Sequence, residues 1–349
     1  MKLITAILSL ILLLVACQKN PTANYWSKSP TEYTWTPDTL EISGVDQILM
    51  SAIWGNSPNS IFVTGISSSP RATVFHFDGN NWSEIASQGG AVTDSVSLRA
   101  VFGFSGNDVW FGGENLYVET TQISEVEKDS AIILHYNGVG WERIPIYGRG
   151  EGGLNIANIW GSNPSDIWFA GYSADIYRWN GSSIERVHLP DEISSTRSYA
   201  NWVTGNSGKE VYFSLATYEL NYRRNQLWRF ANSTWEKLTE PDIKLLQIWM
   251  SPDNTLFKRG GAGSFLEYFD GSNWVYAGLP ASSGVTGPGD NFLMAFDWRG
   301  RVYSYKYKDR QEIEALRLDG IEYKAIWYDG FEAFLLAWQD GKSIVFHGK

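Results

Sequence analysis

The chain has 349 residues, of which 43% are hydrophobic, 15% aromatic and 19% charged, and its formal net charge is −10. This acidity excludes a typical nucleic-acid-binding protein, because phosphate contacts require clustered Lys and Arg. The 17 Trp, 18 Tyr and 17 Phe are typical of a chain built from β-strands with aromatic packing.

An apolar run opens the chain, which begins MKLITAILSLILLLVACQKN. The run is shorter than the ~20 residues of a membrane-spanning helix, so it predicts a signal peptide. The residues from Leu14 to Cys17 resemble the lipobox of bacterial lipoproteins. That resemblance implies cleavage before Cys17 and attachment of lipid, such as palmitate, to this residue. The alternative is an ordinary signal peptide with an incidental cysteine.

The predicted organisation is a signal peptide (1–16), a tether (17–31) and a folded domain (32–349). Gln18 follows the cysteine, and the same resemblance then favours the outer membrane of a cell envelope, with the periplasmic or surface face left open. Removal of residues 1–16 takes away one charged residue, Lys2, so the net charge of −10 becomes −11. Because Cys17 is the only cysteine, we expect no disulfide and no thiolate metal site.

Two short patterns recur along the rest of the chain. The first is an apolar run that ends in an aromatic residue, as in SAIWG, ANIWG, ANWVTG, LQIWM and KAIWY. The second follows about 30 residues later, as in FDGNNW, YNGVGW, WNGSSI, FANSTW and FDGSNW. Its Asp-Gly and Asn-Gly pairs favour hairpin turns between strands.

The spacing of the copies predicts the architecture. Trp54 and Trp327 are separated by six intervals of about 45 residues, when Phe102 and the weaker stretch 284–298 count as copies. Seven such copies with four strand-like runs each predict an all-β, seven-bladed β-propeller. In the third copy we expect strands A to D over 156–160, 167–170, 175–179 and 184–188. Whether the weak sixth copy forms a full blade stays open.

The seventh copy is incomplete, since the chain ends at SIVFHGK (343–349). The segment 32–42 resembles the fourth strand of the other copies, with Trp35 in the position of Trp82. We therefore predict that the N-terminal strand completes the last blade and closes the ring, which removes an open sheet edge. We expect the closed propeller to be a monomer.

Ten of the 17 Trp occupy two repeat positions, which predicts packing between blades rather than catalysis. Strand A carries Trp54, Trp160, Trp202, Trp249 and Trp327, and the start of strand D carries Trp35, Trp82, Trp141, Trp235 and Trp274. The copies resemble the tandem Trp-Gly-x-x-Pro-x-Asp-x-Trp … Asp-Gly-x-x-Trp propeller repeats of bacterial secreted proteins and lipoproteins. This resemblance covers nearly the whole mature chain and implies the architecture. Some members carry names such as glycosyltransferase, which no motif here supports.

The sequence predicts no catalytic residue, no metal and no cofactor. His76 and His135 take a strand C position that Arg178 and Arg229 fill in other copies, which favours a structural role over zinc binding. We place His347 at the turn position of Asp78 and His188 on a strand D. No nucleophile elbow, phosphate loop or calcium loop is present. FDGNNW lacks the Ser of the sialidase Asp-box.

The connections between strands differ in length. The A–B and C–D turns are short and repetitive, whereas the B–C and D–A connections, at 114–130, 147–154, 190–199 and 217–225, are irregular. Long loops on a rigid scaffold commonly carry binding residues. Tyr, Trp and Arg are typical of interfaces, and the candidates are Tyr147, Arg149, Tyr218, Tyr222, Arg223, Arg224, Lys258, Arg259, Trp298 and Trp338. The alternative is that these side chains only cover exposed hairpins.

Three functions remain open at this point. The leading hypothesis is a membrane-anchored, non-enzymatic module that binds a protein, peptide or glycan at the B–C/D–A face. The second is a carbohydrate-active hydrolase or lyase at the same face, with carboxylates among Glu114, Glu151, Asp191 and Glu219. The third is a scaffold in an envelope assembly complex.

Overall fold

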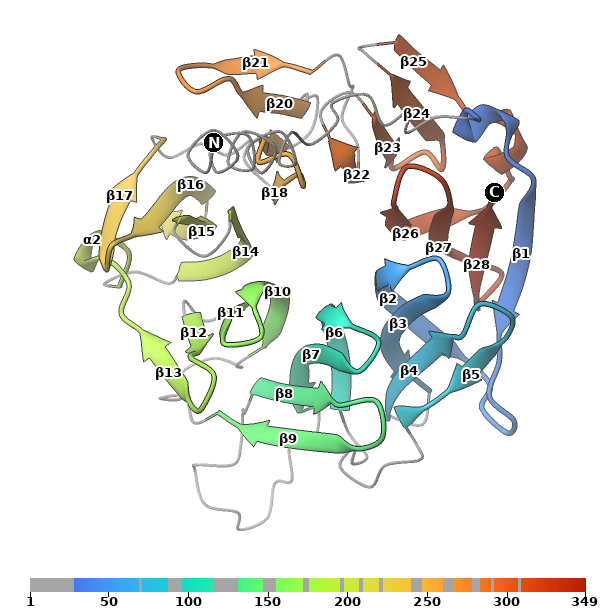
Figure 1. Ribbon diagram of the computed structural model, residues 1–349, viewed down its shortest axis with the longest axis horizontal. Coiled ribbons are helices and arrows are strands. Elements are labelled where there is room, and N and C mark those ends of the chain that lie inside the picture. Colours follow the sequence, from blue (N-terminus) through green and yellow to red (C-terminus); the bar gives the residue numbers. More distant parts are fainter. Residues whose placement is uncertain are drawn as a thin grey trace, which may run out of the picture.

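Seven four-stranded antiparallel sheets surround a central axis, as Figure 1 shows. The computed structural model describes residues 28–68, 71–86, 96–115, 131–146, 155–171, 176–194, 198–206, 210–219, 222–239, 247–259, 266–277, 283–289, 292–306 and 309–349. Within each sheet the strands lie in the order A, B, C, D from the axis outwards. The fold is the predicted seven-bladed β-propeller.

The strand bounds follow the repeat. Blade 1 consists of β2 (Ile48–Ser57), β3 (Ser60–Ser67), β4 (Ala72–Phe77) and β5 (Trp82–Glu84). Blade 2 consists of β6 (Val96–Ser105), β7 (Asp108–Asn115), β8 (Ala131–Tyr136) and β9 (Trp141–Pro145). Blade 3 consists of β10 (Ile156–Asn163), β11 (Asp166–Gly171), β12 (Ile176–Trp179) and β13 (Ile184–Val187). Blade 4 consists of β14 (Ser198–Asn206), β15 (Glu210–Glu219), β16 (Tyr222–Ala231) and β17 (Thr234–Lys237).

The remaining blades include the one whose repeat is weakest. Blade 5 consists of β18 (Gln247–Met250), β19 (Leu256–Arg259), β20 (Leu266–Phe269) and β21 (Trp274–Tyr276). Blade 6 consists of β22 (Gly284–Gly289), β23 (Phe292–Phe296), β24 (Val302–Lys306) and β25 (Asp309–Glu312). Blade 7 consists of β26 (Glu322–Tyr328), β27 (Ala333–Gln339), β28 (Lys342–Gly348) and β1 (Trp35–Leu40). The sixth copy therefore forms a full blade. Three short helices are described: η1 (Pro30–Glu32), α2 (Asp191–Ser194) and η3 (Glu314–Leu316).

The N-terminal strand closes the ring, as predicted. β1 pairs with β28 from Trp35 opposite Gly348 to Leu40 opposite Ser343. The backbone N–H of Thr34 donates to the carbonyl of Lys349 at 3.0 Å. The two chain ends thus take the place of the C–D turn of blade 7.

The Trp-Gly pair of strand A joins neighbouring blades. A Cβ on Gly103 would lie 2.8 Å from the ring of Trp54 in the preceding blade, and a Cβ on Gly205 would lie 2.6 Å from Trp160. Trp327 Nε1 donates to the carbonyl of Gly55 at 2.7 Å. Each ring therefore covers a glycine of the next blade, where a larger residue would not fit. This confirms the predicted packing role.

The Trp at the start of strand D links outer strands in the same way. Trp82 Nε1 donates to Asp38 Oδ2 of β1 at 3.3 Å, and Trp235 Nε1 donates to the carbonyl of His188 at 2.9 Å. Both acceptors belong to the preceding blade. Trp35 takes the predicted position, since it pairs with Gly348 of strand C as Trp82 pairs with Phe77.

A recurring triplet explains the Asp-x-Trp part of the repeat. Asp166 begins strand B, and its Oδ1 accepts from Trp168 Nε1 at 3.1 Å and from Arg178 Nε of strand C at 2.7 Å. Asp108 accepts from Trp110 Nε1 at 3.0 Å and bonds with His135 Nε2 at 2.8 Å. An acid, an aromatic ring and a base thus tie the turn to two strands in blades 2 and 3.

Two predicted repeat positions are wrong. Thr204, not Trp202, stands opposite strand B where Trp54 and Trp160 stand in their blades. Trp202 lies two residues earlier and packs with Ile248 in the interface to blade 5. His347 is not in a turn: it lies on strand C in the position of His76, stacked on an aromatic ring 4.1 Å away. Its Nε2 bonds with Glu332 Oε2 at 2.6 Å, which completes another triplet.

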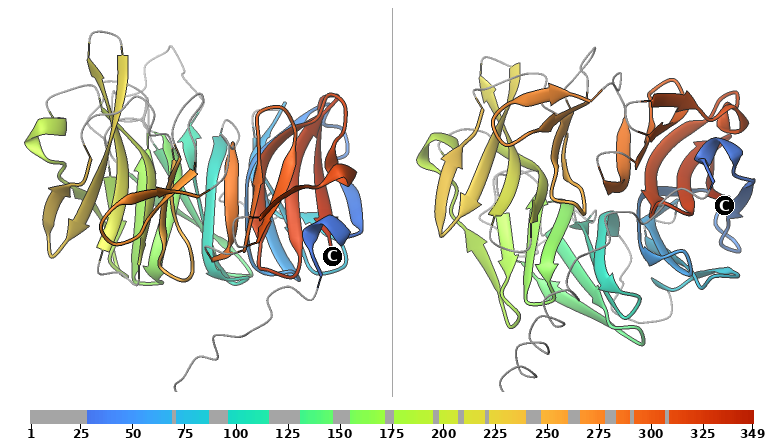
Figure 2. Two further views of the ribbon diagram at one scale, coloured as in Figure 1. Left: turned by 90° about the horizontal axis from the view of Figure 1, so that it is seen from above. Right: turned by 45° about the horizontal axis from the view of Figure 1, so that its top comes forward.

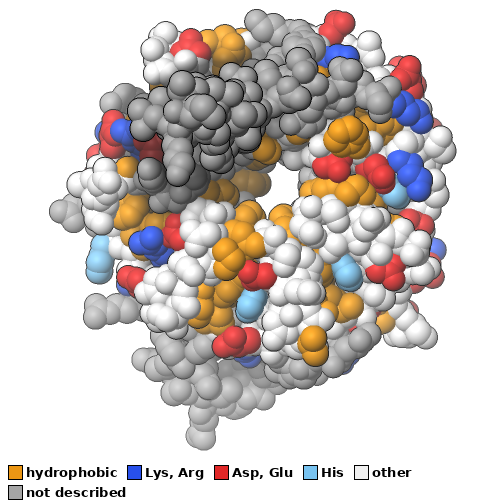
Figure 3. Space-filling model, viewed as in Figure 1, with side chains coloured by type: hydrophobic (Ala, Val, Ile, Leu, Met, Phe, Trp, Pro, Cys, Tyr) orange, Lys and Arg blue, Asp and Glu red, His pale blue; other side chains and the backbone are white. Residues whose placement is uncertain are grey.

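The ring has two faces with different connections. We call the face of the A–B and C–D turns the turn face, and that of the B–C and D–A connections the loop face. Figures 1 and 3 view the turn face, where an opening marks the ring axis. The left view of Figure 2 has the turn face at the bottom, with the C-terminus, and the loop face at the top. None of the described helices has the length and apolar character that crossing a membrane requires.

Candidate functional site

Trp298 stands on a tight turn of the loop face, between β23 and β24. Asp297 Oδ1 accepts the backbone N–H groups of Arg299 at 2.9 Å and Arg301 at 3.0 Å, and its Oδ2 accepts the Tyr303 hydroxyl at 3.1 Å. Gly300 has φ 74° and donates its N–H to the carbonyl of Asp297 at 3.2 Å. One carboxylate therefore fixes the backbone of the whole turn.

The fixed turn presents an aromatic ring to solvent. Trp298 is 73% exposed, so most of this aromatic residue faces solvent. The guanidinium carbon of Arg299 lies 4.9 Å from the centre of this ring, a cation–π distance. An exposed, pre-positioned Trp with an adjacent Arg has the composition of an interface hot spot.

The connection from β25 to β26 extends this feature into a surface. Leu318 on that connection is 39% exposed. Gly300 of the Trp298 turn lies close to Ile321, since a Cβ there would be 2.9 Å from the Ile321 carbonyl oxygen. On the other side, Gln339 Nε2 donates to the carbonyl of Asp319 at 2.9 Å. We call Trp298, Arg299, Leu318, Asp319 and Gln339 the Trp298 surface.

Trp338 contributes to packing as well as to the loop face. Its Nε1 donates to the carbonyl of Met50 in blade 1 at 2.8 Å, so the half-buried ring joins the last blade to the first. Lys324 Nζ lies 3.7 Å from the ring centre and pairs with Glu322. Trp338 thus lies outside the two repeat positions of Trp and still forms a contact between blades.

Lys258 and Arg259 lie inside blade 5. Lys258 Nζ pairs with Glu267 Oε2 at 3.1 Å and lies 4.5 Å from the ring centre of Trp274. Burial lowers the pKa of Arg259. Both side chains are half-buried.

The segment 217–225 is a hairpin and not an irregular loop. β15 and β16 pair without interruption as far as Glu219 opposite Tyr222, with Tyr218 opposite Arg223 and Thr217 opposite Arg224. The hairpin projects from the loop face in the left view of Figure 2. The candidates Tyr218, Tyr222, Arg223 and Arg224 are thus strand residues near its tip. Tyr147 and Arg149 lie outside the described residues.

The four carboxylates of the enzyme hypothesis belong to different connections of blades 2 to 4. Glu114 Oε1 accepts from Arg99 Nε at 2.9 Å, and its Oε2 accepts from Asn155 Nδ2 at 2.9 Å, so both oxygens are engaged. Asp191 begins α2 and Glu219 ends β15, on separate connections of blades 3 and 4. Glu151 lies outside the described residues.

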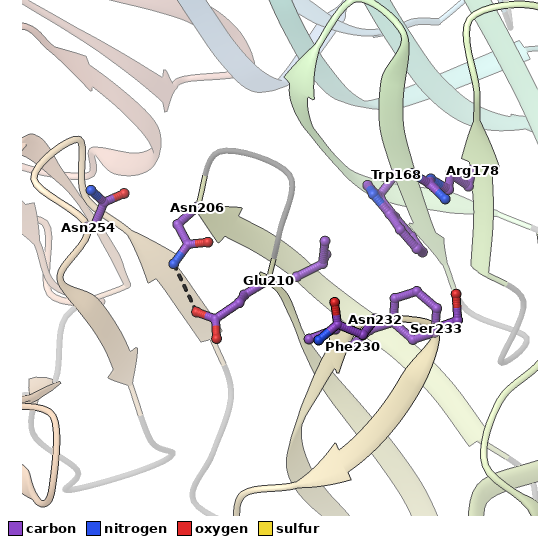
Figure 4. Close-up of a pocket in the computed structure, with 10 residues that line it drawn as sticks. Trp168, Arg178, Asn206, Glu210, Phe230, Asn232, Ser233 and Asn254 are labelled. Atoms are coloured by element: carbon purple, nitrogen blue, oxygen red, sulfur yellow. Dashed lines mark hydrogen bonds between the residues drawn. The ribbon is translucent and has the colours of Figure 1, made fainter.

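A pocket on the turn face was not predicted. It has a volume of about 830 Å³ and lies where blades 3, 4 and 5 meet, and Figure 4 shows its lining. Glu210 Oε2 accepts from Asn206 Nδ2 at 3.0 Å and its Oε1 accepts from Arg229 Nη1 at 2.9 Å. These contacts lower the pKa of Glu210, with the Asn206 hydrogen bond as the largest cause. Arg178 is paired with Asp166, so the charged lining residues already have partners.

The sequence carries one signal for this pocket. The blade 4 turn reads ANST (231–234), where four other copies have Asp-Gly or Asn-Gly. Asn232 and Ser233 consequently adopt φ of 50° and 61°, and both line the pocket. The departure from the repeat marks the place but does not identify a ligand.

The comparisons with known proteins identify the fold. No protein-family profile matches the chain, and no curated protein sequence does. Among solved structures, a YCF48 bound to D1 peptide matches with a TM-score of 0.63 and 15% identity, over 89% of this chain and 96% of that one. YCF48 from Cyanidioschyzon merolae matches with a TM-score of 0.60 and 14% identity, over 90% and 98% of the two chains. A catalytically inactive virginiamycin B lyase from Staphylococcus aureus with quinupristin matches with 0.60 and 16%, over 90% and 99%. At these identities the likeness concerns the propeller architecture.

Proposed function

We propose that this protein is a lipid-anchored, non-enzymatic module of the cell envelope that binds a peptide or protein segment at its loop face. The observation that carries the proposal is the rigid Trp298 turn, which holds a 73% exposed indole beside Arg299. A similar propeller, YCF48, is described as bound to a peptide. The resemblance of Leu14 to Cys17 to a lipobox supports the anchor.

The chemistry of the Trp298 surface indicates which segments it would bind. Trp298 and Leu318 offer apolar contact area, while the exposed Arg299 offers a cation with several N–H donors. A segment with an apolar side chain next to a carboxylate complements both. The fixed turn loses little freedom on binding, and such pre-organisation favours affinity.

The test selects ligands first and then asks where they bind. Peptides are selected on the wild-type domain from a displayed library, and their Kd is measured by calorimetry. We expect Trp298→Ala to weaken binding ~30-fold or more, since loss of an interface anchor costs ~2 kcal/mol or more. Phe331→Ala is the matched control, because Phe331 is also exposed but lies on a turn of the opposite face. Equal Kd values for wild type and Trp298→Ala would refute the assignment of this surface.

The hairpin of blade 4 is tested separately. The triple change of Tyr222, Arg223 and Arg224 to Ala should weaken peptide binding if the ligand reaches across the loop face. The melting temperature should stay within a few degrees, because the three residues lie near the tip of a projecting hairpin and changes away from a core usually cost within ~0.5 kcal/mol. A glycan array with the wild type distinguishes the second hypothesis. Sugars that are bound and cleaved would replace the binding module with an enzyme.

A further inference from the structure

Five turns of the turn face share one geometry. In each, Oδ1 of the first residue accepts the N–H groups of the third and fourth residues, and the second residue is a Gly with positive φ. The five turns begin at Asp78, Asn137, Asn180, Asp270 and Asp329.

The third residue of these turns differs in one respect. Three turns carry a polar residue there, namely Asn80, Ser182 and Ser272. The other two carry Val139 and Phe331, which are 95% and 50% exposed. The same backbone forms with Asn or Ser, so the turn itself does not require an apolar residue. Exposed apolar area is unfavourable in water, and contact with an apolar partner would relieve it.

The two apolar tips lie on the same side of the ring as the start of the domain. Val139 belongs to blade 2 and Phe331 to blade 7, with blade 1 between them. The described chain begins at the same face, where Lys28 Nζ donates to the carbonyl of Lys349 at 3.2 Å. The tether therefore joins the domain at the turn face of blade 7.

The length of the tether restricts how the domain can stand on a membrane. Residues 18–27 separate Cys17 from Lys28, and fully extended they span at most ~36 Å. The longest blade strands have ten residues, which at ~3.3 Å each makes a blade roughly 33 Å high. A tether that ran along the blade would need nearly its full extended length to reach the loop face, whereas contact at the turn face needs no such extension. The length of the tether therefore favours a membrane on the side of the turn face over one at the loop face.

We propose that the turn face of blades 7, 1 and 2 lies against the bilayer, with Val139 and Phe331 in the headgroup region. This inference rests on the lipid anchor of the proposed function. The lipid on Cys17 supplies attachment, and the apolar tips supply orientation. Acidic side chains are spread over this face in Figure 3, and Asp78 and Asp329 belong to the turns themselves, so the lipid should be zwitterionic. The Trp298 surface then points away from the membrane.

The test uses the full lipidated chain in phosphatidylcholine vesicles that contain a headgroup-level quencher lipid. Cys17 carries its lipid through sulfur, so one added cysteine can be labelled with an environment-sensitive fluorophore. We expect quenching and a blue shift for labels at Val139→Cys and Phe331→Cys. Ser272→Cys, at the same turn position on blade 5, should be quenched less, and Leu318→Cys on the loop face should not be quenched.

A second variant asks whether the tips set the orientation. Val139→Ser with Phe331→Ser gives both turns a residue type that blades 3 and 5 already carry, so folding should be unaffected. A label at Asn80→Cys, in the turn of blade 1, should lose its quenching in that double variant while the protein still floats with the vesicles.

The outcomes separate the orientation from the anchor. Flotation with quenching at Leu318→Cys, or with equal quenching at all sites, would overturn the orientation and leave the anchor standing. Wild type that neither carries acyl label nor floats, like Cys17→Ala, would overturn both.

Discussion

The closing strand β1 offers the most decisive test of the fold. A chain that starts at residue 43 lacks the whole strand, and with it Tyr33 and Leu40, which are 6% and 3% exposed, and the half-buried Trp35. Burial of a large apolar side chain contributes ~1.5–3 kcal/mol. The three side chains therefore account for about 5 kcal/mol, comparable with the whole net stability of many domains at ~5–15 kcal/mol.

Relocation of the strand provides the control. Residues 33–42 can be moved behind Lys349 through a short Gly-Ser linker, since Thr34 and Lys349 are already hydrogen-bonded. We expect urea unfolding to show a loss of about 5 kcal/mol for the deletion and recovery of most of it in the relocated variant. Deletion of residues 18–27 should change nothing. A deletion variant as stable as wild type, or a relocated strand without effect, would refute closure through β1.

Three further changes probe the repeat. Trp160→Ala should cost about 3 kcal/mol in urea unfolding, near the low end for Trp because the ring is half-buried, and an unchanged midpoint would contradict its role between blades 3 and 4. Gly205→Ala should lower the free energy of unfolding by ~1–3 kcal/mol, because the added Cβ would lie 2.6 Å from the Glu210 carbonyl oxygen. Gly140→Ala is the control and should be neutral, because its Cβ would lie 3.9 Å from Asn137 and near no other atom. The carboxylates of Asp78 and Asp270 accept backbone hydrogen bonds, from Asn81 and Asn80 and from Asn273 and Ser272, respectively. These bonds hold the pKa of each carboxyl below 3.8. The stability that they contribute is present above that pH and is lost as the pH falls below it. The double variant Asp78→Asn with Asp270→Asn should therefore be as stable as wild type at neutral pH and should lose less stability in acid. An unchanged fall of the melting temperature at low pH would show that these bonds contribute nothing to stability.

The fold could be predicted from the sequence because its contacts repeat. A Trp that covers a glycine of the next blade leaves the same pair at each period, and Trp35 could be aligned with Trp82 for the same reason. The prediction was wrong where a blade departs from the pattern. In blade 4 the Trp moved two residues to position 202, and sequence alone could not separate this shift from the regular position.

The candidate site was predictable only in part. Trp298 stands out because it lies at a B–C turn outside the repeat, and the structure places it on the surface. Leu318 and Gln339 could not be assigned to it, because their proximity depends on how the β25–β26 connection packs between two turns. The β15–β16 hairpin was predicted as a loop because no apolar alternation marks residues 218–224 as strands.

The seam between β1 and β28 has a mechanical consequence. No covalent bond closes the ring, and a tension on the N-terminal tether acts at the end of β1 where Trp35 pairs with Gly348. Because β1 runs from the turn face towards the loop face, a pull away from the turn face acts along the strand and loads the residue pairs from Trp35 to Leu40 together in shear. Under tension the domain should yield first at this seam, with blade 7 opening before any blade whose four strands are continuous in the chain.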